Sequence, residues 1–254
     1  YWFWSEQLSP GESASIASES TSAPPDARRE TQVVPDIPAQ LAPETLDDVV
    51  PSSRKVVERL APSPATSDEQ LRQVLSSAGF NALLMPFISD QHPVDISAAL
   101  IDGLGRGMLL RKILPADPPK TPFGTTVEGG VTYMSAASYR RYDLYADAIA
   151  ALDVAVLAEA FHRLRSGYEM AFERLGLDSQ DFDNAILRSL DVVLSTPEIT
   201  EPIALERKSV MYLYVDPELE KLPSAQKQLL RTGPENIRRI KQVAQSLRDR
   251  LLQE

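Results

Sequence analysis

Apolar residues recur most regularly along the segment from Ser135 to Gly176. Their steps of three and four residues place side chains on one face of a helix. The positions are Val154, Leu157, Phe161, Leu164, Tyr168, Ala171 and Leu175. The pattern predicts a long central helix ending near Gly176, preceded by a break near Asp153 and a shorter helix from Tyr139 to Ala151.

Segments with the same spacing predict further helices on both sides of this one. We expect them at residues 67–78, 82–88, 95–113, 181–194, 224–230 and 234–251. Ser67 is a suitable N-cap for the first of them. Gly103, Gly105 and Gly107 interrupt the third, so either that helix breaks there or a neighbour packs closely against it.

Two segments carry strand signals. Residues 130–133 favour a short strand pair, and residues 203–215 fit one or two strands or a buried connector. The sequence therefore predicts a mainly α, helical-bundle-like domain with at most a small β-hairpin.

The beginning of the chain differs from the rest in composition. Residues 5–66 are rich in Pro, Ser, Ala and acidic residues and poor in large apolar groups. Such a segment cannot offset the entropy of ordering, so we expect a disordered linker at 5–66 and the helical domain at 67–254.

Residues 1–4, Tyr-Trp-Phe-Trp, contain both tryptophans of the chain. Tryptophan and tyrosine gather where membrane-spanning helices meet the lipid headgroups. We interpret these residues as the end of a removed transmembrane helix, with a cloning remnant or a buried N-terminal strand as alternatives. Four acidic residues precede the first basic residue, Arg28. Because cytoplasmic flanks are typically basic, we expect the folded domain outside the cytoplasm.

Charge and composition exclude several classes of protein. The 254-residue chain has a formal net charge of −10, which argues against nucleic-acid binding. The absence of cysteine removes disulfides, thiolate metal sites and cysteine nucleophiles. Glu159 and His162 form one Glu-x-x-His pair, but a di-iron bundle needs two such pairs, and His92 is the only other histidine. We expect neither a metal nor a cofactor.

Catalysis by paired carboxylates stays open. The candidates are Asp143, Asp147, Asp181 and Asp183. Their role depends on separations that a sequence does not reveal. Two histidines leave little acid–base equipment, so the sequence favours a protein that is not an enzyme.

The strongest candidate for binding precedes the central helix, and its chemistry is aromatic and basic. It comprises Tyr139, Arg140, Arg141, Tyr142, Asp143 and Tyr145. Tyrosine and arginine are enriched at binding hot spots, although the same side chains can bridge a core and solvent or form internal ion pairs. No catalytic residue can be assigned.

Five short motifs carry a family resemblance. They are YRRYD at 139–143, DFDN at 181–184, SVMY at 209–212, DPEL at 216–219 and GPEN at 233–236. With them the chain resembles an uncharacterised bacterial family of membrane-anchored envelope proteins, domain of unknown function 3014. The resemblance implies an N-terminal membrane helix, a proline-rich spacer and a helical C-terminal domain. It implies no activity.

These observations lead to one functional hypothesis and one alternative. We expect a single-pass protein of the bacterial inner membrane whose folded domain lies in the periplasm. There it serves as a non-enzymatic interaction or scaffolding module that binds an envelope protein or a cell-wall component. The alternative is an enzyme or ligand-binding domain that acts on the cell wall or a small metabolite.

Overall fold

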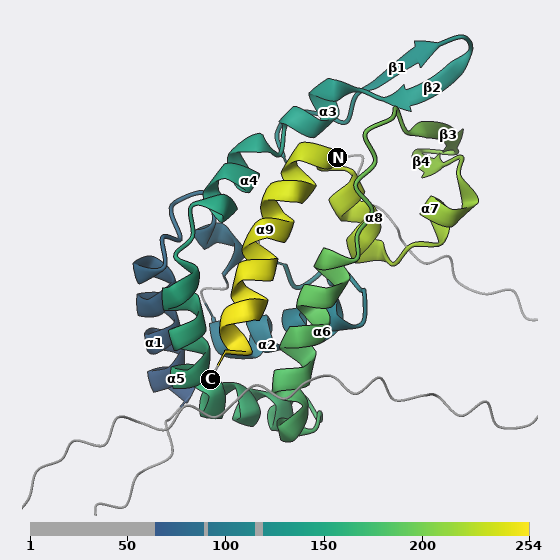
Figure 1. Ribbon diagram of the computed structural model, residues 1–254. Coiled ribbons are helices and arrows are strands. Elements are labelled where there is room, and N and C mark those ends of the chain that lie inside the picture. Colours follow the sequence, from purple (N-terminus) through teal and green to yellow (C-terminus); the bar gives the residue numbers. More distant parts are fainter. Residues whose placement is uncertain (1–63, 89–90, 115–118, 254) are drawn as a thin grey trace, which may run out of the picture.

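The computed structural model describes residues 64–88, 91–114 and 119–253. Helices dominate this part of the chain, which confirms the predicted mainly helical fold (Figure 1). The helices are α1 (Pro64–Ser77), α2 (Pro93–Gly105), α3 (Ala136–Arg140), α4 (Asp143–Ala150), α5 (Val154–Arg174), α6 (Phe182–Leu194), α7 (Pro217–Lys221), α8 (Ser224–Leu230) and α9 (Pro234–Leu251). Two single 3-10 turns, η1 (Met85–Phe87) and η2 (Ser179–Asp181), connect some of them.

The central helix predicted from apolar periodicity is α5. The Asp153 side chain accepts bonds from the backbone N–H groups of Ala155 and Val156 at 2.9 and 3.1 Å, so it caps the helix. At the other end, Gly176 has a φ of 74°, the left-handed conformation that glycine adopts most easily. Leu175, expected on the buried face, is instead 42% exposed because the helix ends just before it.

Aromatic rings fill the main core between α5 and α6. Phe182 is 1% exposed and lies against three rings of α5. Its centroid is 4.6 Å from that of Tyr168, and 5.4 Å from those of Phe161 and Phe172. Since such pairs add to the free energy of apolar burial, this stack is the strongest packing contact between the two helices.

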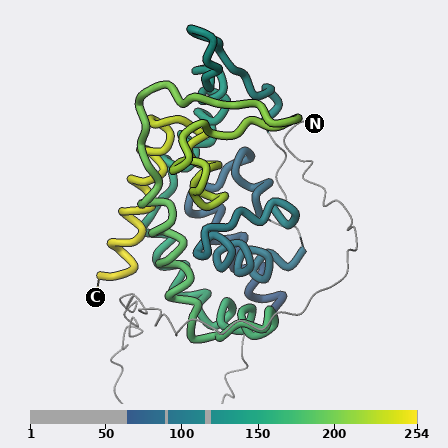
Figure 2. Tube along the Cα trace, turned by 90° about the vertical axis from the view of Figure 1, so that its right-hand side faces the viewer, coloured from purple at the N-terminus to yellow at the C-terminus, as the bar shows by residue number. Residues whose placement is uncertain are grey.

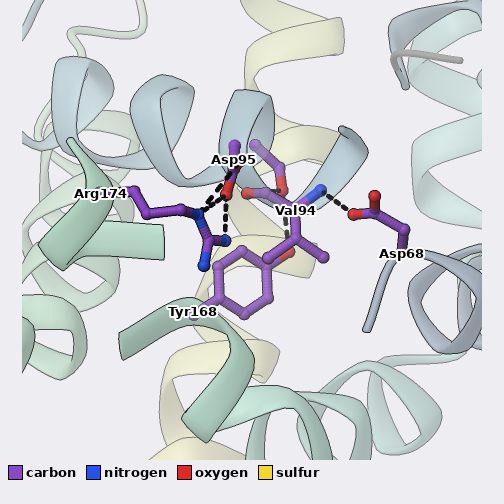
Figure 3. A network of polar contacts seen from close by, with 6 residues as sticks. Asp68, Val94, Asp95, Tyr168 and Arg174 are labelled. Carbon is purple, nitrogen blue, oxygen red and sulfur yellow. Dashed lines mark hydrogen bonds and ion pairs between the residues drawn. The ribbon is translucent and has the colours of Figure 1, made fainter. Parts of the chain in front are cut away.

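A polar network joins α1, α2 and α5 at the edge of this core (Figure 3). Asp68 accepts a hydrogen bond from the backbone N–H of Val94 at 3.2 Å, and Arg174 forms an ion pair with Asp95. The Tyr168 hydroxyl lies 2.9 Å from Ser97 Oγ. Every one of these groups has a partner inside the domain, so we assign the network to fold stability.

The β structure is larger than one hairpin. Strands β1 (Thr125–Glu128) and β2 (Val131–Met134) form the first hairpin, and β3 (Ala204–Lys208) and β4 (Met211–Tyr214) form the second. The hairpins pair through β2 and β3 into an antiparallel sheet of order β1-β2-β3-β4. Residues 203–215 are therefore mostly strand rather than a buried connector. In both views the β1–β2 hairpin projects beyond the helices (Figure 1, Figure 2).

A second core lies between one face of the sheet and α8 and α9. It buries Met134, Ile203, Leu205, Tyr214, Leu230 and Ile237. The outer strand β4 is also held by side chains. Its Tyr214 N–H donates to Glu220 at 2.9 Å, and its Tyr212 carbonyl accepts from Arg231 at 3.4 Å. This anchoring places β4 beside α8.

Several expected helix boundaries differ from the structure. Helix α1 begins at Pro64, so Ser67 is not its N-cap but a residue inside the helix, 2% exposed and next to Gly167. The third predicted helix ends at Gly105 instead of reaching residue 113. A Cβ on Gly105 would lie 3.0 Å from the Ala185 carbonyl oxygen, so the close packing expected at the glycines is confirmed.

The expectations for residues 1–4 and for most of the linker fall outside the described residues. Within 64–88, 91–114 and 119–253, no helix is long and apolar enough to cross a bilayer.

Candidate functional site

The predicted binding residues lie where α3 meets α4. Ser135 caps the start of α3, because its side chain accepts from the Ser138 backbone N–H at 3.3 Å. Ser138 Oγ exchanges two 2.7 Å hydrogen bonds with the backbone of Gly124, one as donor and one as acceptor. This pairing ties α3 to the segment that leads into β1. The corner at Arg141 and Tyr142 then turns the six residues toward different neighbours.

Tyr139 and Asp143 face inward toward the start of α9. A Cβ on Gly233 would lie 2.7 Å from Tyr139 Cγ, so the tyrosine packs directly on the glycine backbone. Buried Asn236 donates from Nδ2 to Asp143 Oδ1 at 2.8 Å and to the Thr232 carbonyl at 3.0 Å. Burial raises the pKa of Tyr139. These two predicted residues serve the fold.

Arg141 and Tyr142 belong to a different group of side chains, which we call the arginine–aromatic cluster: Phe123, Arg141, Tyr142, Gln228 and Arg231. The guanidinium carbon of Arg141 lies 5.3 Å from the ring centroid of Phe123 and 4.9 Å from that of Tyr142. Arg231 lies 5.6 Å from the same Phe123 ring. One phenylalanine thus attracts two guanidinium groups from distant parts of the chain.

Hydrogen bonds order this cluster. The Tyr142 hydroxyl accepts from Gln228 Nε2 at 3.0 Å and from Arg141 Nη2 at 3.2 Å. Arg141 Nη1 donates to the Thr121 carbonyl at 3.4 Å, and Gln228 Oε1 accepts from Arg111 at 3.4 Å. The cluster is therefore rich in donors.

The electrostatics of Arg141 are unusual for an acidic protein. Burial lowers the pKa of its guanidinium and the nearby positive charge of Arg231 lowers it too, although Tyr142 acts in the opposite direction. Its Nε is buried and has no hydrogen-bond partner within the described residues. Across the same residues, Arg141 forms no salt bridge with a carboxylate. The aromatic rings and the Tyr142 hydroxyl offset part of the desolvation cost of this half-buried cation, but no carboxylate within the described residues does.

The other two predicted residues lie apart from the cluster. Arg140 is exposed at the end of α3. Tyr145 packs edge-on against Phe87, with ring centroids 5.8 Å apart. The six residues are thus divided between the fold, the cluster and the surface.

Phe123, Gln228 and Arg231 are members of the cluster that sequence reasoning missed. Phe123 lies outside the helices and strands and follows no apolar period. Arg231 is one of several basic residues near the C-terminus, and nothing in the sequence sets it apart from them. No signal in the sequence placed either of them beside Arg141.

Asp181 and Asp183, considered for catalysis, form ion pairs inside the domain, and His162, considered as a metal ligand, packs edge-on against Phe161. Asp181 pairs with Arg188 at 2.6 Å, and this hydrogen bond lowers the Asp181 pKa. Asp183 forms an ion pair with Arg165 from the buried side of α6. Burial lowers the pKa of His162, and so does the nearby Arg165. In the described ranges no three His, Cys, Asp or Glu side chains gather as a metal site requires.

Comparison with known proteins gives one match. The sequence model of a family described as "Protein of unknown function (DUF3014)" matches residues 94–248. The chain belongs to this family. Neither curated proteins nor solved structures gave a match.

Four of the five motifs that carried the resemblance meet at one end of this DUF3014 domain. GPEN supplies Gly233 and Asn236, which contact Tyr139 and Asp143 of YRRYD. SVMY supplies Tyr212, whose ring centroid is 5.6 Å from that of Phe123. DPEL begins with Asp216, which caps α7 by accepting from the Glu218 N–H at 2.8 Å. YRRYD and SVMY therefore supply or touch members of the arginine–aromatic cluster, GPEN packs behind YRRYD, and DPEL begins α7, whose Leu219 packs against the second core.

Proposed function

We propose that this DUF3014 protein is a non-enzymatic, membrane-tethered interaction module that binds another component of the bacterial envelope. The surface formed by Arg140 and the arginine–aromatic cluster makes the contact. One observation carries the proposal: Arg141 is half-buried between two aromatic rings and has no carboxylate partner in the described structure.

Charge supplies the first argument. A chain with a net charge of −10 has many carboxylates to offer, and most other arginines near the core use one. Arg165, Arg174 and Arg188 each pair with an aspartate. An acidic group on a partner would supply what Arg141 lacks, and arginine and tyrosine are common anchors of interfaces.

Exposed apolar side chains at the same end supply the second argument. Eight large hydrophobic residues are exposed in the described part of the chain, and five of them lie in or beside the sheet. These five are Val127, Val131, Val210, Met211 and Val215. Val127, Val131, Val210 and Met211 flank the turns of the two hairpins, at the end of the sheet that points away from α3. This apolar area extends the proposed contact surface along the sheet, because protein interfaces combine apolar area with a few polar anchors.

The membrane tether and the periplasmic location rest on the sequence. The aromatic residues 1–4 and the acidic segment that follows them support a spanning helix whose folded side lies outside the cytoplasm. A reporter fused on the C-terminal side of the folded domain, in the protein that carries the proposed spanning helix, tests this part. Activity of a periplasmic reporter is expected, and activity only of a cytoplasmic reporter would refute the location.

Site-specific photo-crosslinking tests the contact surface. A photoreactive amino acid replaces Arg140, which is exposed at the end of α3. In a control chain it replaces Arg163 on α5, which is also exposed. We expect a discrete crosslinked product from position 140 in intact envelopes and none from position 163. The product should weaken when Arg141→Lys is added. Equal crosslinking from both positions would refute the proposed surface.

A further inference from the structure

The arginine–aromatic cluster contains hydrogen-bond donors that lack acceptors. The Tyr142 hydroxyl already accepts two hydrogen bonds, from Gln228 and Arg141, so its own proton is available to donate. Arg141 Nε is buried and has no acceptor in the described structure. A buried donor left without an acceptor is destabilising, so an acceptor delivered to this place is favoured.

The two free donors lie next to each other. Nη2 of Arg141 binds the Tyr142 hydroxyl at 3.2 Å, and Nε and Nη2 share one edge of the planar guanidinium group. An acceptor with two oxygens could therefore take the Nε proton with one oxygen and the tyrosine proton with the other. Carboxylates and phosphates have this geometry and bind arginine through such an edge.

The local charge selects an anion. Arg231 approaches the same Phe123 ring as Arg141, and its positive charge acts on Arg141. Phe123, Tyr142 and Tyr212 provide the walls, which limit the access of water and strengthen electrostatic attraction. Arg141 and Tyr142 are half-buried and keep some exposed surface. Arg141 Nε itself is covered, so an anion reaches it through a small side-chain movement of the kind that is common on binding.

From this geometry we infer that Arg141 and Tyr142 form an oxyanion-binding site. Arg231 provides a second positive charge nearby, and the Phe123 ring packs against both guanidinium groups. The ligand is a carboxylate or phosphate group. The inference rests on the proposed function in that such a group, carried by the envelope partner, anchors the contact. The site itself binds the isolated anion.

The test is an NMR titration of the 254-residue chain, followed through the Nε–H signals of its arginines. The probes are inorganic phosphate and acetate, added separately at constant ionic strength. We expect the Arg141 signal to shift with saturation. The exposed Arg163, which is paired with Glu159, serves as the internal control and should not saturate.

Two variants remove one donor each. Arg141→Lys keeps the charge and removes the guanidinium edge, while Tyr142→Phe removes only the hydroxyl. Each should weaken binding by about tenfold or more, since a hydrogen bond to a charged group is lost. Arg163→Lys is the matched control and should bind like the parent chain. Thermal unfolding of each variant shows that the fold is retained.

The probes also distinguish the source of the anion. Tighter binding of phosphate indicates a phosphate group, and binding of acetate that is equal or tighter indicates a carboxylate. Vesicles of phosphatidylglycerol, compared with phosphatidylcholine alone, separate a lipid headgroup from a free phosphate. Absence of saturation with every probe, or unchanged affinity in both variants, would overturn the inference. If crosslinking from position 140 persists in that case, the proposed function stands without the anion site.

Discussion

Gly233 offers the sharpest test of how the motifs assemble this end of the domain. It precedes α9 with φ 87° and ψ 159°, a region of backbone conformation that is essentially restricted to glycine. A Cβ there would also lie 2.7 Å from Cγ of Tyr139, far inside the normal carbon–carbon contact of about 3.5–4.0 Å. Gly233→Ala therefore meets two separate penalties.

Both penalties have known scales. The backbone conformation costs on the order of 1–3 kcal/mol, and forcing an extra methyl into a packed contact costs a similar amount. Their sum is about 4 kcal/mol. For a domain of this size each kcal/mol lowers Tm by about 2–4 °C, so Gly233→Ala should lower Tm by about 8–16 °C.

Two comparisons separate the penalties. Gly176 also has a positive φ of 74°, but a Cβ there meets nothing within 4 Å, so Gly176→Ala should lower the free energy of unfolding by only about 1–2 kcal/mol. In a Tyr139→Ala background the steric penalty disappears, and Gly233→Ala should cost about 2 kcal/mol less than in the parent. Chemical unfolding of the four chains measures this coupling. Strict additivity, or a Gly233→Ala effect no larger than that of Gly176→Ala, would refute the reasoning.

Three further predictions follow from the core, the titrating groups and the linker. Phe161→Ala should cost about 3–5 kcal/mol in chemical unfolding because it removes a buried ring from the stack on Phe182; a smaller loss than 1 kcal/mol contradicts the packing. Burial raises the pKa of Tyr168 to about 12, above the value of about 10 in the unfolded chain, so the unfolded state releases its proton first. Stability should therefore fall between about pH 10 and pH 12, and Tyr168→Phe should make that decline shallower; an unchanged slope would count against it. Removing residues 1–62 should leave Tm within a few degrees, since their composition predicts few packed contacts, whereas a large drop would show that they dock on the domain.

Apolar periodicity predicted the helices that line the core. The stripe from Phe161 to Ala171 is buried as its spacing requires, and α6 covers nearly all of the range 181–194 predicted for it. Pro234 begins α9 as the missing proline N–H allows. These features depend on neighbours a few residues apart, which is the range that a sequence pattern reports.

The cluster could not be predicted in the same way. Arg141 and Arg231 are far apart in sequence and meet because both approach Phe123, a residue with no periodic neighbours. The candidate segment was recognised from its composition, but the turn at Arg141 and Tyr142 directs Tyr139 and Asp143 into the fold. Contacts with α8 and α9 determine which of these side chains face solvent. The spacing of residues within the segment does not predict contacts with helices that are distant in sequence.

Recovery of the envelope partner from cells tests the central claim most directly. The parent chain is compared with Arg140→Ala/Arg141→Ala, and recovery is expressed per amount of folded protein after crosslinking. Arg140 is exposed, but Arg141 loses its contacts with Phe123 and Tyr142 in this variant, so Tm is measured first and recovery is compared at a temperature where both chains are folded. The double variant should then recover about tenfold less partner, or still less, than the parent chain does. Full recovery of the partner by a folded double variant would contradict the claim that this surface recognises it.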